Sequence, residues 1–181
     1  MKKLKRTQFG NPILRQKTAK LSSEQIKSED VQNFIKDIQN TLSTKDYGIG
    51  LAAPQVGRSI SLAVIALKPT PTRPDNKELK MVIINPEIIS TDSTEVGMWE
   101  ACISGSDIYG KAMRHENIRL KWHDETGKLH EQEFSGIVAQ VIQHEVDHLN
   151  GVLFVDRVID TKTYITFAEY KKLQKIKNKQ I

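Results

Sequence analysis

The residues with the clearest chemical potential form a His-Glu-x-x-His pattern within QHEVDHLNG, residues 143–151. In a helix, His144 and His148 lie about one turn apart on the same face, where both imidazoles can reach one metal ion. Glu145 projects about 100° around the helix axis from His144, so its carboxylate can address a metal-bound water instead of the metal. The spacing predicts the metal site and general base of a metal hydrolase.

A short pattern of this kind also arises by chance, in which case the histidines are ordinary partly buried side chains and Glu145 is a surface charge. The apolar residues around the pattern argue against this alternative. Ionisable groups on a buried helix need partners, and a divalent cation would supply one.

A catalytic site of this class needs a third protein ligand. A metzincin would have a histidine three residues after Gly151, where the sequence has Phe154. A thermolysin-like zinc peptidase could use Glu169, although the surrounding lysines indicate a solvated helix. Cys102 is the remaining candidate, because a thiolate and two imidazoles suit Zn(II) or Fe(II). For Cys102, a buried structural role and a nucleophilic Cys–His pair stay open.

The pattern lies in a predicted helix that begins at Gly136, ends near Leu149 and is followed by Asn150 and Gly151. Ser135 is a potential N-cap, and the glycine is typical of a helix end. Apolar residues occupy more than one side of this segment, which predicts a buried central helix.

Apolar periodicity and turn residues predict the other elements. These are an amphipathic helix over 28–43, strands over 60–67 and 81–84 joined by an exposed loop over 68–80, a hairpin over 117–124 and 129–134, and a helix from Thr161. We expect an α+β fold in which antiparallel sheets and hairpins surround the central helix. We also expect a single catalytic domain over residues 1–181, with 161–181 as a basic C-terminal helix or tail.

Composition sets wider limits. The chain has 181 residues, one cysteine and a formal net charge of +5. A single cysteine excludes an intrachain disulfide and suits a reducing cytosol. The charge favours polyanionic surroundings without identifying a binding site. The first residues lack the apolar stretch of a secretory signal, and no later segment has the length of a membrane span. We therefore expect a cytoplasmic protein with no membrane or DNA partner.

Three motifs occur in a fixed order: GIGLAAPQ at 48–55, EACIS at 100–104 and QHEVDHLNG at 143–151. With these motifs the chain resembles the peptide deformylase family, in its bacterial form with a helical C-terminal tail. The opening QFGNPILRQKT and the hairpin also resemble the family, so the similarity extends to about Asp156. The resemblance implies hydrolysis of the N-formyl group from the formyl-methionine of nascent polypeptides, with release of formate.

Position by position, the resemblance implies that Cys102, His144 and His148 hold one divalent metal and that Glu145 is the general acid and base. It favours Fe(II) as the native metal, with Zn(II), Ni(II) or Co(II) compatible with purified protein.

The resemblance also implies that the Gln55 side-chain amide and the Ile103 backbone N–H meet the developing oxyanion. The residues expected to contact the peptide or its methionine side chain are Ile49, Gly50, Met98, Ala101, Ile137 and Val141. Core packing is an equal alternative for the apolar pocket candidates. Gly48 and Gly50 are either turn residues with positive φ or glycines that let a peptide backbone approach closely.

The sequence departs from the family pattern after the first motif. Ala101 and Ile103 replace the more common glycine and leucine, Gly105–Ser106 replaces an apolar residue and proline, and Tyr109 lies near the place of an arginine. These changes bear on rate and peptide preference. Two other functions stay open: a thermolysin-like zinc peptidase, and a noncatalytic metal-bearing module that docks on RNA or the ribosome through the basic tail.

Overall fold

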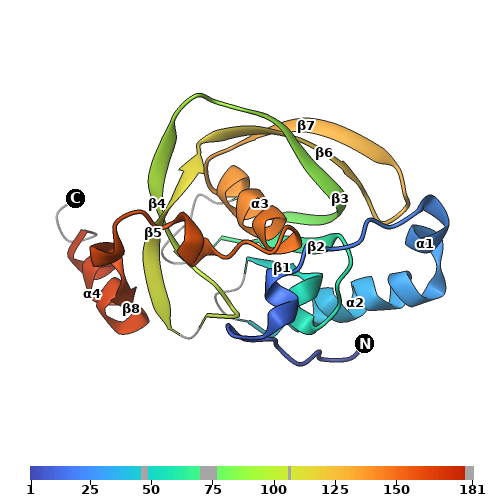
Figure 1. Ribbon diagram of the computed structural model, residues 1–181, viewed down its shortest axis with the longest axis horizontal. Helices are drawn as coiled ribbons and strands as arrows, with labels where there is room; N and C mark the ends of the chain where they lie inside the picture. Colours follow the sequence, from blue (N-terminus) through green and yellow to red (C-terminus); the bar gives the residue numbers. More distant parts are fainter. Residues whose placement is uncertain (46–48, 70–76, 106, 178–181) are drawn as a thin grey trace.

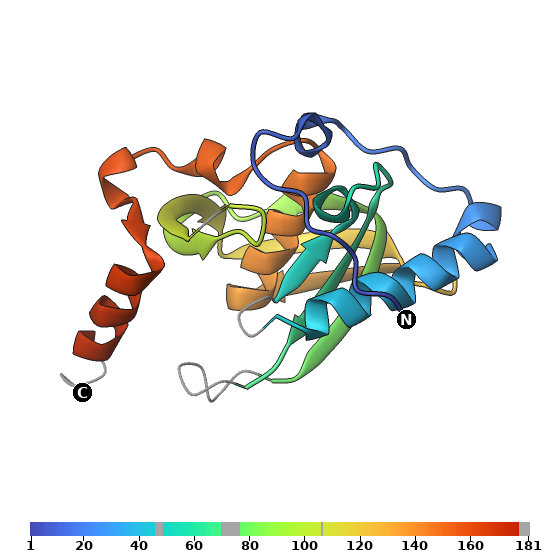
Figure 2. The ribbon, with the colours of Figure 1, turned by 90° about the horizontal axis from the view of Figure 1, so that it is seen from below.

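The structure is a computed structural model that describes residues 1–45, 49–69, 77–105 and 107–177. It contains two antiparallel sheets and a central helix, α3 (Gly136–Leu149). Figure 1 shows α3 enclosed by strands, with helices α2 and α4 at opposite ends of the molecule, as Figure 2 also shows. The predicted α+β fold, with antiparallel sheets around the helix that carries the His-Glu-x-x-His pattern, is confirmed.

The larger sheet has the strand order β1-β2-β3-β6-β7, and the smaller sheet has the order β4-β5-β8. The strands are β1 (Gly50–Ala52), β2 (Leu62–Leu67), β3 (Leu79–Thr91), β4 (Glu95–Ala101), β5 (Ile108–His115), β6 (Asn117–His123), β7 (Leu129–Ser135) and β8 (Ile165–Thr166). The other helices are α1 (Ser23–Lys27), α2 (Glu29–Ser43), α4 (Phe167–Lys177) and the 3-10 helices η1 (Pro12–Arg15), η2 (Ala53–Val56), η3 (Phe154–Arg157) and η4 (Thr161–Thr163). β1 and β4 therefore lie at sheet edges.

Strand β2 divides the apolar core into two halves. Successive side chains of a strand point to opposite faces of the sheet. Leu62 and Val64 pack with the buried residues of α2. Ala63 and Ile65 face the other way and pack with α3. Because helices cover both faces, β2 has the continuous apolar run that predicts a buried strand.

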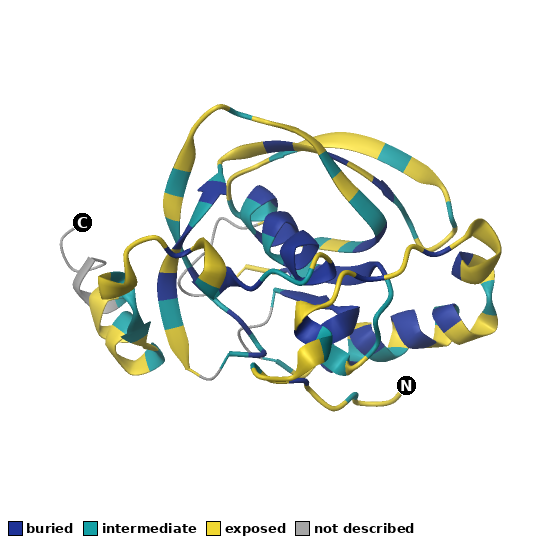
Figure 3. Cartoon of the chain, in the orientation of Figure 1, coloured by how far each residue is buried: buried dark blue, intermediate teal, exposed yellow. Residues whose placement is uncertain are grey.

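Helix α2 covers one face of the larger sheet with its apolar side. Ser28 is its N-cap and accepts a hydrogen bond from the backbone N–H of Val31. The side chains that α2 buries are Val31, Phe34, Ile35, Ile38, Thr41 and Leu42. Figure 3 shows this division between a buried and an exposed side. The amphipathic helix predicted for residues 28–43 is confirmed.

Helix α3 begins and ends where the sequence predicts, but its cap differs. Ser135 occupies the N-cap position and its side chain makes no capping hydrogen bond. The N–H of Gly136 instead donates to the backbone oxygen of Glu116, at 3.0 Å. This backbone contact with the turn between β5 and β6 satisfies one of the helix's first N–H groups, which have no partner within the helix itself.

Strands β4 and β5 are not predicted by the sequence pattern. The buried positions of β5 are Gly110, Ala112 and Arg114, so the strand lacks the alternating large apolar residues that predict a half-buried strand. β3 extends well beyond the predicted 81–84, and the C-terminal helix begins at Phe167 instead of Thr161. The hairpin is confirmed as β6 and β7.

Some predicted features lie outside the described residues: Gly48, the centre of the 68–80 loop, Ser106 and residues 178–181. Within the described ranges, no helix is both long and apolar enough to cross a membrane.

Candidate active site

Two distant parts of the chain bring together a cysteine and two histidines. Helix α3 presents His144 and His148 one turn apart, and Cys102 follows the last residue of β4. The Cys102 Sγ lies 3.1 Å from the His148 Nε2. One potential ligand atom from each residue lies within 4.8 Å of the others. Cys102 and His148 are buried, and the His144 side chain is 11% exposed.

The donor set fits a divalent metal. One sulfur and two imidazole nitrogens are typical ligands of Zn(II) and Fe(II). His144 directs its Nδ1 to the Glu100 carboxylate at 2.9 Å, which leaves Nε2 available as a ligand. Burial raises the pKa of the Cys102 thiol, but the neighbouring His148 and His144 outweigh burial and hold it well below its ordinary value. Cys102 is thus predisposed to the thiolate form that binds metals.

A buried ionic network holds this site in place. Arg114 of β5 donates to both carboxylate oxygens of Glu100, at 2.8 and 3.0 Å, and to Asp147 of α3 at 2.5 Å. Arg157 also donates to Asp147, at 2.7 and 3.0 Å. Burial would raise the pKa of Glu100, but hydrogen bonds and charge from His144 and Arg114 lower it to about 2. The ionised Glu100 therefore orients the His144 ring and, through Arg114, links strands β4 and β5 to helix α3.

Sequence reasoning missed this network. Glu100 and Asp147 lie inside the second and third motifs, so their position was a usable signal. Arg114 carried no such signal, because the strand on which it lies was not predicted.

We expect Arg114→Met to lower the free energy of unfolding by about 3–5 kcal/mol, because it leaves the buried Glu100 without its cation. Urea unfolding of the metal-loaded protein measures this effect. Arg119→Met is the matched control, since Arg119 pairs with Glu131 at 2.8 Å while both side chains are more than 40% exposed. Its expected loss is below about 1 kcal/mol. Equal losses for the two variants would contradict a special role for the buried pair.

Glu145 is buried beside the two histidines and is only 2% exposed. Its Oε2 has no hydrogen-bond partner among the described residues. Burial raises the pKa of this carboxyl to about 7, despite the opposing charges of His144 and His148. A carboxyl with a pKa near neutrality can both accept and return a proton.

Gly50 of β1 packs directly against Glu145. A Cβ at position 50 would lie 2.7 Å from the Glu145 Cδ, closer than side chains tolerate. Gly50 does not have a positive φ. The turn interpretation of Gly50 is therefore wrong, and the residue is glycine because Glu145 leaves no room for a side chain.

Gly50→Ala should reduce kcat/KM for the hydrolysis in which Glu145 is the expected general acid and base. The expected reduction is roughly 100-fold, because the methyl group displaces the Glu145 carboxylate. The strand backbone itself accepts alanine, so far-UV circular dichroism should not change. Gly97→Ala on β4 is the matched control, since its Cβ would meet Lys111 at an ordinary 3.6 Å. Comparable activity of the two variants would contradict the steric explanation.

Gln55 and Ile103 lie on the Cys102 side of the site. Gln55 is 1% exposed and follows β1 in η2. Its Oε1 accepts from the Ala52 N–H at 2.7 Å, so its Nε2 points to the Cys102 Sγ at 3.3 Å. Ile103 follows Cys102 and belongs to the wall of the same cavity. An amide donor and a backbone segment therefore lie beside the potential metal.

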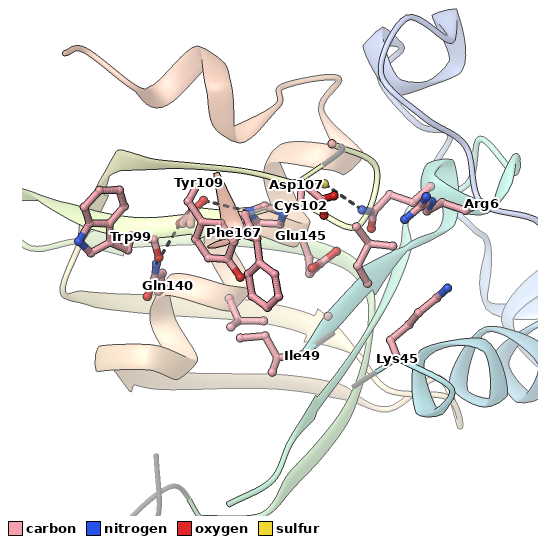
Figure 4. A pocket seen from close by; sticks show the side chains of 18 of the residues that line it. Arg6, Lys45, Ile49, Trp99, Cys102, Asp107, Tyr109, Gln140, Glu145 and Phe167 are labelled. Carbon is pink, nitrogen blue, oxygen red and sulfur yellow. Dashed lines mark hydrogen bonds and ion pairs between the residues drawn. The ribbon is translucent and has the colours of Figure 1, made fainter. Parts of the chain in front are cut away.

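A cavity of about 470 Å³ opens over these groups. Figure 4 shows Cys102 and Glu145 at its centre, with Ile49 nearby. The predicted peptide-contacting residues in its wall are Ile49, Gly50, Ala101, Ile137 and Val141. Met98 lies on β4 outside this wall, and Tyr109 is part of it.

The alternative ligand Glu169 is not brought to this site. Its side chain is 56% exposed and forms an ion pair with Lys172 at 2.7 Å. Among the described residues, the Cys102, His144 and His148 group is the one found with metal-ligand geometry. A thermolysin-like arrangement is therefore not formed.

The sequence model of the family described as polypeptide deformylase matches residues 4–164. The chain belongs to the polypeptide deformylase family. "Peptide deformylase 2" of Nostoc sp. is 40% identical over 167 residues, which cover 92% of each chain. The peptide deformylase of Leptospira biflexa is 40% identical over 158 residues, covering 86% of this chain and 88% of the relative.

Solved deformylase structures have the same fold. A class I type b peptide deformylase from Acinetobacter baumannii with bound Met-Ala-Ser superposes with a TM-score of 0.81 at 35% identity, covering 86% of this chain and 98% of the other. The Thermotoga maritima deformylase gives a TM-score of 0.76 at 32% identity, covering 88% and 100%. The protein is accordingly a metal-dependent peptide deformylase, which removes the N-formyl group from nascent peptides.

Proposed function

We propose that Cys102, His144 and His148 hold a single divalent cation, which is Fe(II) in the cell, and that Glu145 is the general acid and base. Zn(II), Ni(II) or Co(II) would be compatible with the same donor set in purified protein. One observation carries the proposal: the buried Glu145 Oε2, which has no hydrogen-bond partner within the described part of the chain, belongs to a residue that lines the same cavity as the donors Cys102 and His144. A cytoplasmic location suits this site, because a thiolate ligand and Fe(II) are both sensitive to oxidation.

The chain's own residues account for the proton transfers. When bound, the metal would act as a Lewis acid and lower the pKa of water, which produces a nucleophile for the formyl carbon. Glu145 accepts the proton from that water at its free carboxylate oxygen. The same carboxyl then donates the proton to the departing amine of methionine, so that formate and a free N-terminus result.

Gln55 and Ile103 provide the hydrogen-bond donors for the oxyanion. The Gln55 amide orientation is set by its Oε1, which accepts from Ala52 and turns the Nε2 donor towards the site. The Ile103 backbone N–H is the second donor. Donors that are positioned before the reaction stabilise developing charge without a cost of reorganisation.

The peptide backbone binds between two strand edges. Gly50 on β1 and Ala101 at the end of β4 both line the cavity, and each strand lies at the edge of its sheet. An edge strand offers backbone N–H and C=O groups to an extended peptide. Ile49, Ile137 and Val141 supply the apolar wall for the methionine side chain, whereas Met98 does not line the cavity.

The decisive experiment is anaerobic release of formate from formyl-Met-Ala-Ser by Fe(II)-loaded protein. Acetyl-Met-Ala-Ser is the matched control, because the added methyl group must be rejected beside Glu145 and Gly50. Rapid release from the formyl peptide alone supports the proposed substrate. No release from fully metal-loaded protein would refute it.

The ribosome is the proposed partner of the C-terminal tail, which has five lysines between residues 171 and 179. Clustered lysines attract a polyanionic RNA surface, and this attraction weakens with salt. We expect deletion of residues 172–181 to weaken co-sedimentation with ribosomes at low salt while formate release from a free tripeptide continues. Unchanged co-sedimentation would remove the ribosome from the proposal.

A further inference from the structure

A cluster of aromatic rings joins helix α4 to strands β4 and β5. Tyr109 stacks on Tyr170, with ring centroids 4.3 Å apart and an interplanar angle of 12°. Tyr109 also stacks on Phe167, at 5.8 Å and 16°. Trp99 meets the Tyr170 ring edge-on at 5.5 Å. These contacts hold the first turns of α4 against the smaller sheet.

Three of these rings belong to the wall of the active-site cavity. Trp99, Tyr109 and Phe167 line the same space as Cys102 and Glu145, and we call these three residues the aromatic wall. In the view of Figure 4 all three lie on the same side of Cys102 and Glu145. The C-terminal helix therefore contributes directly to the space in which the peptide binds, through Phe167.

The strand register places the aromatic wall along the path of the peptide. Ala101 and Trp99 are two residues apart on β4, so their side chains share a face of the strand. The residue opposite Ala101 on β5 is Tyr109. A peptide paired along the free edge of β4 that leads away from Cys102 passes Ala101 first and reaches Trp99 about 7 Å further on. This distance corresponds to about two residues of extended peptide.

Apolar ring surface favours apolar and aromatic side chains. Rings that pack together gain from burial and from offset or edge-on geometry. Contacts with α4 already hold the partly buried rings of the wall in place. Binding of a peptide side chain would therefore cost little additional conformational entropy in these rings. We propose that the aromatic wall is a subsite for an apolar or aromatic side chain at the second or third position of the formylated peptide. This inference rests on the proposed function.

The test compares kcat/KM for formyl-Met-Phe-Ser and formyl-Met-Ala-Phe with that for formyl-Met-Ala-Ser, using Ni(II)-loaded protein. We expect the better aromatic peptide to be preferred by roughly 3- to 10-fold, with the difference mainly in KM. Phe167→Ala and Phe167→Leu should both reduce this ratio towards 1. The leucine variant keeps apolar volume under α4. If the alanine variant does not fold, the leucine variant still tests whether the Phe167 ring causes the preference for the aromatic peptide.

Leu173→Ala is the matched control, because Leu173 is an apolar residue on the same helix, is 44% exposed and does not line the cavity. It should keep the wild-type ratio. A wild-type ratio near 1, or a ratio that survives in both Phe167 variants, would overturn the subsite. If wild-type protein released no formate from any of the three peptides, the proposed function would fall as well, so the two failures are distinguishable.

Discussion

Glu145→Gln should lower kcat for formate release by roughly 10²–10⁴-fold, the range expected for loss of a general acid and base. Glutamine has nearly the same shape and fits the space beside Gly50, but its amide cannot accept and return the proton. The three metal ligands are not altered, so metal content after gel filtration should equal that of the wild type. Formate release and metal analysis of the same preparation test both statements.

The control for this variant is Glu169→Gln. Glu169 is exposed on α4, where its carboxylate pairs with Lys172 at 2.7 Å. Its replacement should leave both formate release and metal content as they are. A Glu145→Gln variant with more than about a tenth of wild-type kcat would contradict the assignment of the proton transfers.

Cys102→Ala should abolish stable metal binding and, with it, formate release. Two imidazoles remain, but a catalytic metal of this class requires three protein ligands. The change in thermal stability gives a readout that does not depend on activity. Saturating metal at about 100 times its dissociation constant stabilises a folded protein by about 2.7 kcal/mol. Added metal should therefore raise the Tm of the wild type and leave the Tm of the variant nearly unchanged.

His130→Gln is the control for the loss of a metal-binding side chain. His130 lies on β7, where its Nε2 contacts the Asp124 carboxylate at 2.7 Å, and it does not line the cavity. This variant should show the same metal-dependent rise in Tm as the wild type. A similar rise in Cys102→Ala would mean that the metal is held elsewhere.

The accuracy of the sequence prediction differed between elements for physical reasons. The predicted limits of α2 and α3 match the structure closely, since helical periodicity and end signals are local properties of the chain. β5 escaped prediction because its buried positions are Gly110, Ala112 and Arg114. A charged residue becomes a core residue only when Glu100 and Asp147 are folded around it.

The sequence by itself determined the helical spacing of His144, Glu145 and His148, and its three motifs indicated the family. Spacing within one helix depends only on the geometry of the helical backbone. Tertiary structure alone decided that Glu145 excludes a side chain at Gly50 and that Phe167 reaches the cavity. These contacts join elements far apart in the chain, and their distances depend on how the two sheets and α4 pack.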